Sequence, residues 1–406
     1  MDSQPVPKQE RLAVFLLGTV QFVNILDFMM IMPLGPDFSV QLGIRASLLG
    51  LLGAAYAVAA CGAGLLGAWV LDRFDRKKAL LWALLGLILG TVAGGFAVGF
   101  KSMMASRLLA GLFGGPATSL AISALTDLVP IHRRGRAIGA VMGAFSVASV
   151  AGVPMGLWLA RQGSFRTPFF AVSGLGVLVM FFIKAVLPPM TAHLSRKEVQ
   201  CSLRELLQRK NVKWSLASVA LSNIGAFAII PNIAPYLIMN CGMPRTDLEY
   251  LYAIGGLCTF FSMRFVGRLV DGLGTQPVMF FTSILLSIVI GVGFLPGHNI
   301  VPIVVVFVGF LVSGTARNVC VGAASSRVGA ANERARYQSI QSAVQHLASA
   351  CGSSLGSLLL YETLDKRLGG IDKLSMISIV ATLLMPLFIY QFEKAERNQQ
   401  VRTSVE

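Results

Sequence analysis

The sequence predicts an all-α membrane protein with 12 transmembrane helices, arranged as two pseudo-symmetric six-helix bundles around a central cavity. The first observation is composition: 55% of the 406 residues are hydrophobic, 13% are charged, and the mean hydropathy is +0.70. Soluble domains carry about 25% charged residues, so this chain is an integral membrane protein. The second observation is a series of long apolar segments along the chain. The third is that prolines, aspartates and basic motifs of the first half recur in the second.

Roughly 12 apolar windows are each long enough to cross about 30 Å of hydrocarbon. They must be helices, because each backbone polar group within a bilayer has to be satisfied inside its own segment. The first six windows cover 12–36, 47–71, 79–98, 102–125, 135–160 and 167–187. The second six cover 214–239, 247–270, 276–295, 300–324, 335–361 and 371–392.

The net charge of +15 follows the expected membrane topology. If the N-terminus is inside, roughly 22 Lys and Arg fall on the cytoplasmic side and roughly 8 outside, so both termini are expected to be cytoplasmic. The charges are distributed by side of the membrane and not as one patch, which argues against a nucleic-acid partner. The largest cytoplasmic contributors are Arg73, Arg76, Lys77 and Lys78, then Arg133, Arg134 and Arg136, then the stretch from Arg196 to Lys213.

The longest polar stretch, Pro188 to Lys213, separates six windows from six. We expect an N-terminal bundle over residues 1–190, a cytoplasmic linker over 191–213 and a C-terminal bundle over 214–406. Two six-helix repeats of the same orientation are typical of secondary transporters, whose site lies at midplane between the halves. The features that recur at an offset of about 200 residues are Pro33 and Pro36 with Pro231 and Pro235, Asp72 with Asp271, and Arg134-Gly135-Arg136 with Arg334-Ala335-Arg336.

A single aspartate, Asp27, lies in the apolar run 12–31, near the middle of the first expected span. A carboxyl at mid-membrane depth costs roughly 2.5–3.5 kcal/mol on insertion scales, so it usually serves a pathway or a proton relay. Gln21 and Asn24 share its helical arc. Arg107 in the fourth window could reach Asp27 and, since arginine does not deprotonate, would bias the carboxyl without carrying the proton. Two alternatives stay open: a structural carboxyl permanently paired with Arg107, and an arginine that only packs or snorkels.

Polar residues in other windows are candidates for the walls of a substrate cavity. In the eleventh window, Gln338, Gln341 and Gln345 share one helical face, and such a stripe should face a cavity or another helix. His346 adjoins it and can exchange protons near neutral pH, although a hydrogen-bonded interior residue is the simpler interpretation. The full set of cavity candidates is Gln21, Asn24, Asn223, Asn232, Arg264, Arg317, Gln341, Gln345 and His346.

Charges at the cytoplasmic helix ends are candidates for a gate. Asp72, Arg73 and Arg76 lie in a tight turn after the second window, Asp127 ends the fourth, and Asp271 ends the eighth. Opposite charges there could latch helix ends when this face is closed. The alternative is a solvated charge cluster with a topological role alone.

Small residues form a stripe at helical spacing along the fifth window. Its members are Gly139, Gly143, Ser146, Ser149, Gly152 and Gly156. Glycines four residues apart permit close backbone approach, so plain helix packing is the simplest interpretation. Packing this close would also allow helices to slide and bend past each other.

Four motifs carry a resemblance to a known family. The loop from Ala68 to Lys78 is similar to the signature Gly-x-x-x-Asp-Arg-x-Gly-Arg-Lys, with Ala68 and Asp75 in place of its two glycines. Arg107-Leu-Leu-Ala-Gly111 is similar to an Arg-x-x-x-Gly element, and Asp27 before Pro33 and Pro36 to an acid-then-proline pattern. Gly152-Val153-Pro154-Met155-Gly156 is similar to an antiporter element around Gly-Pro, although a valine intervenes. The chain thus resembles the major facilitator superfamily and, within it, the 12-helix drug:proton antiporter branch (multidrug or sugar efflux).

The resemblance implies a secondary transporter that alternates between inward and outward states and exports its substrate as protons enter. Gly152, Pro154 and Gly156 would then form the antiporter-motif hinge. The leading function is proton-coupled efflux of small amphipathic or cationic compounds. The alternative is an exporter or uptake carrier of a polar metabolite such as a sugar or amino acid, favoured by the glutamine stripe and by the scarcity of acids in the cavity.

An enzyme is disfavoured, since the sequence has no His-Glu-x-x-His pair, no nucleotide-binding loop and only 4 histidines. We therefore expect no cofactor and no metal, with the proton gradient as the driving force. The expected partners are a small-molecule substrate, protons and the lipid bilayer, with no nucleic acid, and the chain is expected to act as a monomer. The resemblance places it in the cell inner (cytoplasmic) membrane as a multi-pass protein.

Overall fold

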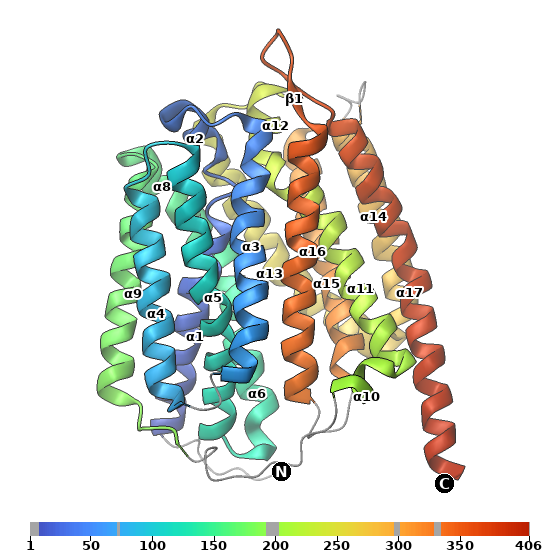
Figure 1. The fold of residues 1–406 in the computed structure, drawn as a ribbon. Helices are drawn as coiled ribbons and strands as arrows, with labels where there is room; N and C mark the ends of the chain where they lie inside the picture. The colour runs from blue at the N-terminus through green and yellow to red at the C-terminus, as the bar shows by residue number, and fades with distance from the viewer. Residues whose placement is uncertain (1–7, 71–73, 192–202, 296–300, 329–333, 406) are drawn as a thin grey trace. The chain divides into compact units, whose positions relative to one another are not determined.

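The protein is described by a computed structural model in residues 8–70, 74–191, 203–295, 301–328 and 334–405 (Figure 1). The chain divides into two compact units. The first comprises Met1–Gly43 and Ala55–Glu198, and the second comprises Ile44–Ala54 and Val199–Glu406. Of the linker expected over 191–213, residues 192–202 lie outside the described residues, and the chain is helical from Leu203.

The first unit is built from long apolar helices. The helices in chain order are α1 (Lys8–Met29), α2 (Gly35–Leu42), α3 (Leu49–Val70), α4 (Arg76–Gly95), α5 (Phe100–Leu128), α6 (Ile131–Met142), α7 (Ala144–Val147), the π-helix η3 (Ala148–Gly152), α8 (Val153–Gln162) and α9 (Arg166–Val186). The short 3-10 helix η1 (Ala46–Leu48) precedes α3, and the start of α3 up to Ala54 clusters with the second unit.

The second unit repeats this plan and adds one small hairpin. Its helices are α10 (Leu203–Gln208), α11 (Lys210–Ile229), η5 (Ile230–Asn232), α12 (Ile233–Met239), η6 (Arg245–Asp247), α13 (Leu248–Leu273), α14 (Thr275–Phe294), α15 (Ile303–Ser326), α16 (Arg334–Leu359) and α17 (Ile371–Val405). The strands β1 (Tyr361–Glu362) and β2 (Leu368–Gly369) pair antiparallel between α16 and α17. Two two-residue strands are too short to be stable alone, and Asn240 holds β2 through hydrogen bonds with both the N–H and the C=O of Leu368.

The first membrane helix of each unit is broken at its prolines. The first window is continuous only to Met29, and α2 restarts at Gly35 with a proline in its first turn. In the second unit, η5 and then α12 follow α11, again with prolines at the break. A proline has no N–H to donate to the preceding turn, which ends the helix there. Asp27 therefore lies in the last turn of α1 and not near the middle of a continuous helix.

The all-helical membrane fold expected from the sequence is confirmed. Among the described residues, 11 helices are long and apolar enough to cross a membrane. The twelfth expected window is also a helix, the 26-residue α16. It falls outside those 11 because its glutamines, serines and His346 lower its hydropathy, as expected for a helix with one polar face.

Glycines set the closest helix contacts in the first unit. A Cβ built on Gly90 of α4 would lie 2.5 Å from the backbone nitrogen of Ala110 and 2.7 Å from its Cα, both on α5. The two backbones can approach this closely because no side chain separates them, as in other small-residue contacts of membrane helices. By contrast, a Cβ on Gly174 of α9 would meet nothing within 4 Å.

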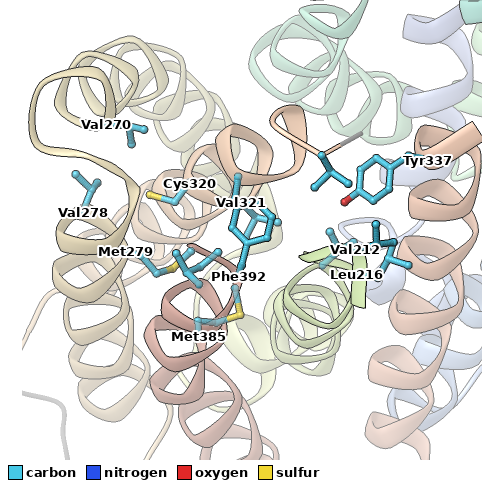
Figure 2. Close-up of a cluster of buried hydrophobic side chains, with 14 of the residues drawn as sticks. Val212, Leu216, Val270, Val278, Met279, Cys320, Val321, Tyr337, Met385 and Phe392 are labelled. Carbon is cyan, nitrogen blue, oxygen red and sulfur yellow. The ribbon is translucent and has the colours of Figure 1, made fainter. Parts of the chain in front are cut away.

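The second unit contains a hydrophobic cluster that joins six of its long helices. Figure 2 shows Val212 and Leu216 of α11, Val270 of α13, Val278 and Met279 of α14, Cys320 and Val321 of α15, and Met385 and Phe392 of α17 in this cluster. Tyr337 of α16 lies at its edge, and its hydroxyl is 2.6 Å from the hydroxyl of Ser215. A buried tyrosine hydroxyl needs such a partner, so this contact also fixes α16 against α11.

We expect Gly90→Ala to lower the thermal stability of the purified protein, since the added methyl group would force α4 and α5 apart. Overpacking of this kind typically costs about 1–3 kcal/mol. Gly174→Ala is the matched control, because it also changes a helix glycine but places the methyl group in open space, and it should leave the melting temperature unchanged or raise it. Equal melting temperatures for the two variants would contradict the close α4–α5 contact.

Candidate functional site

The first unit buries an aspartate–arginine ion pair. The Asp27 carboxylate on α1 and the Arg107 guanidinium on α5 are both 0% exposed, and Arg107 Nη1 lies 3.1 Å from Asp27 Oδ2. The Thr91 hydroxyl on α4 lies 2.7 Å from the other carboxylate oxygen, Oδ1, and donates a hydrogen bond to it. Arg107 also has its Cζ 5.2 Å from the centre of the Phe169 ring on α9. Four helices of the unit therefore meet at this pair.

The guanidinium fits because α4 has no side chain beside it. A Cβ built on Gly94 would lie 3.0 Å from Arg107 Nη2 and 2.5 Å from Phe169 Cε1. Nη2 has no hydrogen-bond partner among the described residues. The opposite charges of Asp27 and Arg107 therefore compensate each other, while Arg107 Nη2 keeps N–H groups that are not hydrogen-bonded.

A second polar group lies one turn earlier along α1. Asn24 is 6% exposed and accepts a 2.6 Å hydrogen bond from the Tyr56 hydroxyl of α3. Its amide nitrogen donates to the Thr118 hydroxyl and to the Gly114 carbonyl of α5. Gln21, one turn further along the same face, is 1% exposed, and neither of its amide atoms has a partner among the described residues. Gln21, Asn24 and Asp27 thus form one buried polar face of α1.

The remaining cavity candidates are in the second unit and form separate groups. Asn223 accepts a hydrogen bond from Ser349 of α16 at 3.3 Å, and Asn232 is 0% exposed with its side-chain oxygen unpartnered among the described residues. Gln345 is exposed, His346 is half-buried on the next position of α16, and Gln341 has an unpartnered side-chain oxygen.

The two arginine candidates of this unit differ in their surroundings. Arg264 is exposed, with its Cζ 4.5 Å from the centre of the Phe260 ring one turn away. Arg317 is 1% exposed and donates to the Thr382 hydroxyl and the Ser222 carbonyl. Of these two arginines, only Arg317 has a charge that is buried inside its unit.

The gate candidates are described in part. Asp72 and Arg73 lie outside the described residues. Arg76 Nη1 is 2.6 Å from Asp127 Oδ2 and also donates to the Ser123 carbonyl, so α4 and α5 are joined at this end. Asp271 is exposed and lines a cavity of about 890 Å³ in the second unit, together with Arg327, Glu393 and Glu396. Arg327 forms ion pairs with both glutamates, at 3.3 and 3.6 Å.

The candidate hinge differs from one regular helix. The fifth window is divided into α6, α7, the π-helix η3 and α8, and Pro154 lies in the first turn of α8. Since Pro154 cannot donate to the preceding turn, the widened π turn with its Val153 N–H to Ala148 C=O bond accommodates it. Gly152 and Gly156 line an apolar pocket of about 250 Å³ with side chains of α1 and α9, whereas Gly139 is exposed. The stripe of small residues is therefore divided at the π turn.

Several residues of the buried polar groups were missed by the sequence analysis. Thr91, Tyr56, Thr118 and Phe169 all contact the predicted candidates directly. Each is a common residue type in a membrane helix, so composition gives no signal. A helical-wheel comparison of α4 could have singled out Thr91 as a hydroxyl in an otherwise apolar window.

Two units of long apolar helices, each with buried polar groups, define a multi-pass membrane protein. A sequence profile of the Major Facilitator Superfamily matches residues 17–353. The chain belongs to this superfamily of transporters.

Similar proteins include a drug-resistance protein, an efflux pump and a symporter. A chloramphenicol resistance protein of Streptomyces lividans is 25% identical over 64% of this chain and 65% of its own length. A purine ribonucleoside efflux pump of Shigella dysenteriae is 26% identical over 64% of each chain. The matched segment thus spans just under two thirds of these relatives. The crystal structure of a D-xylose-proton symporter has the same fold, with a TM-score of 0.77 and 17% identity over 94% of this chain and 97% of that chain.

We expect a double-mutant cycle on Asp27→Asn and Arg107→Met to show strong coupling. Removal of one partner leaves an uncompensated buried charge, which typically costs about 3–5 kcal/mol, so each single variant should lose more stability than the double variant. The measurement is the thermal unfolding of the four proteins in detergent. The Arg76→Met and Asp127→Asn cycle is the control for a partly exposed pair. Additive losses at Asp27 and Arg107 would contradict a mutually compensating pair.

Proposed function

We propose that the protein is a proton-coupled antiporter that exports small amphipathic or cationic compounds by alternating access. The observation that carries this proposal is the fully buried Asp27–Arg107 pair, which joins α1 to α5. It is supported by the relatives, one named for chloramphenicol resistance and one for purine ribonucleoside efflux. The protein would lie in the cytoplasmic membrane as a monomer, with both termini cytoplasmic and no cofactor.

The coupling follows from electrostatics in a low dielectric. With the carboxylate ionised, the ion pair and the Thr91 hydrogen bond hold α1, α4 and α5 together. A proton on Asp27 would remove the negative charge and leave the Arg107 guanidinium buried without compensation. Protonation would therefore favour an arrangement in which Arg107 finds another acceptor or water. In this way a proton entering from one side would change the relative stability of two packings of the same helices.

The residues in this proposal have distinct roles. Asp27 carries the proton, and Arg107 sets when the carboxyl accepts it, while Thr91 orients the carboxylate. The hinge would be Gly152, Pro154 and Gly156, where the π turn and the missing N–H weaken the backbone hydrogen-bond ladder. The Arg76–Asp127 pair would act as part of the gate at the cytoplasmic end.

A second candidate function is export or uptake of a polar metabolite. The observation that favours it is Gln21, buried at 1% exposure with a free amide beside the Asn24–Tyr56–Thr118 group. Buried polar atoms are normally hydrogen-bonded, so an unused amide suits a ligand that brings its own donors and acceptors. Sugar hydroxyls and nucleoside bases have that chemistry, whereas lipophilic cations do not.

We expect proteoliposomes containing the native chain to accumulate substrate against its gradient when a pH gradient is imposed, and Asp27→Asn to abolish this uphill movement. Downhill exchange of the same compound should survive in Asp27→Asn, because the variant loses the proton carrier and not the pathway. A panel of lipophilic cations, nucleosides and sugars separates the two candidate substrate classes. Asp365→Asn, at an exposed position in the hairpin, is the control.

Uphill transport by Asp27→Asn at the native rate would refute the coupling role of this residue. Uphill transport of nucleosides or sugars, with lipophilic cations inert, would replace the first substrate class by the second. A native chain that moves compounds only downhill would make the protein a uniporter.

A further inference from the structure

The first unit has an exposed seam, the line along which α4 and α9 meet at its surface (Figure 1). Phe96, the C-cap residue of α4, contacts Phe170 near the start of α9, with the ring centres 5.2 Å apart. At the other end, Lys77 Nζ in the first turn of α4 donates to the carbonyl oxygen of Leu187, the C-cap residue of α9. The two helices are therefore antiparallel neighbours from end to end.

One exposed stripe of α4 follows this seam. Its members are Lys78, Trp82, Leu89 and Phe96, and their spacings of four and seven residues keep them on one face of the helix. All four side chains are exposed, that of Trp82 by 69%. Because Phe96 contacts Phe170 across the seam, the stripe runs along the seam and ends at Lys78.

A matching stripe lies on α9. Phe170, Val177 and Lys184 are exposed and follow each other at intervals of seven residues, or two turns, so they share one helix face. This face adjoins the seam, since Phe170 contacts Phe96. In an antiparallel pair, the aromatic contact marks one end of the seam, and Lys184 and Lys78 both lie toward the other end.

The two lysines at this end carry uncompensated charge. Among the described residues, neither the Lys78 nor the Lys184 ammonium has an ion-pair or hydrogen-bond partner. The carboxylate of Asp75, at the N-cap of α4, already accepts from the N–H groups of Lys77 and Met190. The end of the seam therefore offers two free cationic donors to a ligand with negative charge.

The length of the apolar stripe matches one leaflet of a bilayer. Both helices belong to candidate membrane spans, Arg76–Gly95 and Arg166–Val186, so hydrocarbon surrounds their exposed apolar side chains. Leu89 follows Lys78 by 11 positions, which is about 16 Å along a helix and about half of the 30 Å hydrocarbon thickness. The seam thus combines a cationic end at headgroup level with an apolar surface as long as an acyl chain.

We propose that one anionic phospholipid of the bilayer binds along this seam in the first unit. Lys78 and Lys184 hold its phosphate, and one acyl chain packs against Trp82, Leu89 and Val177. Basic residues between membrane helices favour anionic headgroups, and tryptophan favours the headgroup boundary. The lipid fastens α4 to α9 from outside and is not the transported compound, so this inference does not rest on the proton coupling proposed for Asp27.

The first test counts bound lipid by native mass spectrometry of the purified full-length protein. Phosphatidylglycerol and phosphatidylcholine with identical chains are titrated separately, and we expect one phosphatidylglycerol to be held more tightly than any phosphatidylcholine. Each lysine beside an anionic headgroup contributes about fivefold in affinity, so Lys78→Gln combined with Lys184→Gln should weaken phosphatidylglycerol binding by about 30-fold.

The matched control removes the same charge elsewhere. Lys101 at the start of α5 and Lys373 in the second unit are both exposed, and Lys101→Gln combined with Lys373→Gln should bind phosphatidylglycerol as the native chain does. Equal affinity of the native chain and the Lys78 and Lys184 double variant would overturn the proposal. All four positions are exposed, so neither double variant disturbs the core.

A second test distinguishes a lipid from its phosphate alone. Trp82→Ala leaves the charge unchanged but removes apolar contact with the chain, so it should weaken phosphatidylglycerol binding by about threefold or more. Trp158→Ala, at an exposed tryptophan of α8, is the control and should leave the affinity unchanged. Native affinity in Trp82→Ala would overturn the proposal. So would displacement of the lipid by excess inorganic phosphate but not by sodium chloride of equal ionic strength.

Lipid binding and proton-driven transport are separate outcomes. Asp27 is buried on α1, so Asp27→Asn should retain phosphatidylglycerol as the native protein does, whatever its effect on uphill transport. Loss of the lipid in Asp27→Asn would place the binding at the ion pair and overturn its assignment to the seam.

Discussion

The low dielectric of the bilayer is the constraint on which the rest of this structure depends. Without water, backbone polar groups must be satisfied within each segment, which makes every span a helix and restricts breaks to positions such as Pro33 and Pro231. The same constraint makes each buried charge expensive, so the charges that remain inside must be compensated. In the first unit, Asp27 and Arg107 compensate each other at 3.1 Å. Their neighbours can then be neutral, and the four helices around them pack tightly.

Glycine packing and the buried charges are linked. Gly94 leaves room for the Arg107 guanidinium beside α4, and Gly90 lets α4 and α5 approach at the same time. The Arg107 side chain is therefore buried at a place where α4 has no side chain. On α4, glycines thus both allow the close contact with α5 and leave room for the Arg107 guanidinium.

Much of the fold could be predicted from the sequence, because apolar windows, polar loops and prolines are local signals. The lone acid in an apolar run pointed to Asp27, and side-chain length pointed to Arg107. The partners of this pair could not be predicted: Thr91 and Phe169 reach it only because four helices pack in one particular rotation. Arg264 shows the same limit, since its window is apolar but its side chain is exposed over Phe260. Burial of a single residue on a membrane helix depends on helix rotation, which a sequence window does not contain.

The π turn at Ala148–Gly152 has a consequence for how the fifth membrane segment can move. It holds one residue more than an α turn, so the helix after it is rotated by about 100° relative to a regular continuation. If the π turn shifted by one residue along the chain, the residue that it passes would turn to another face of the helix. The segment would keep its length in the membrane. The segment can thus exchange which side chains it presents to α1 and α9 by a change of register, without breaking a helix or exposing new apolar surface.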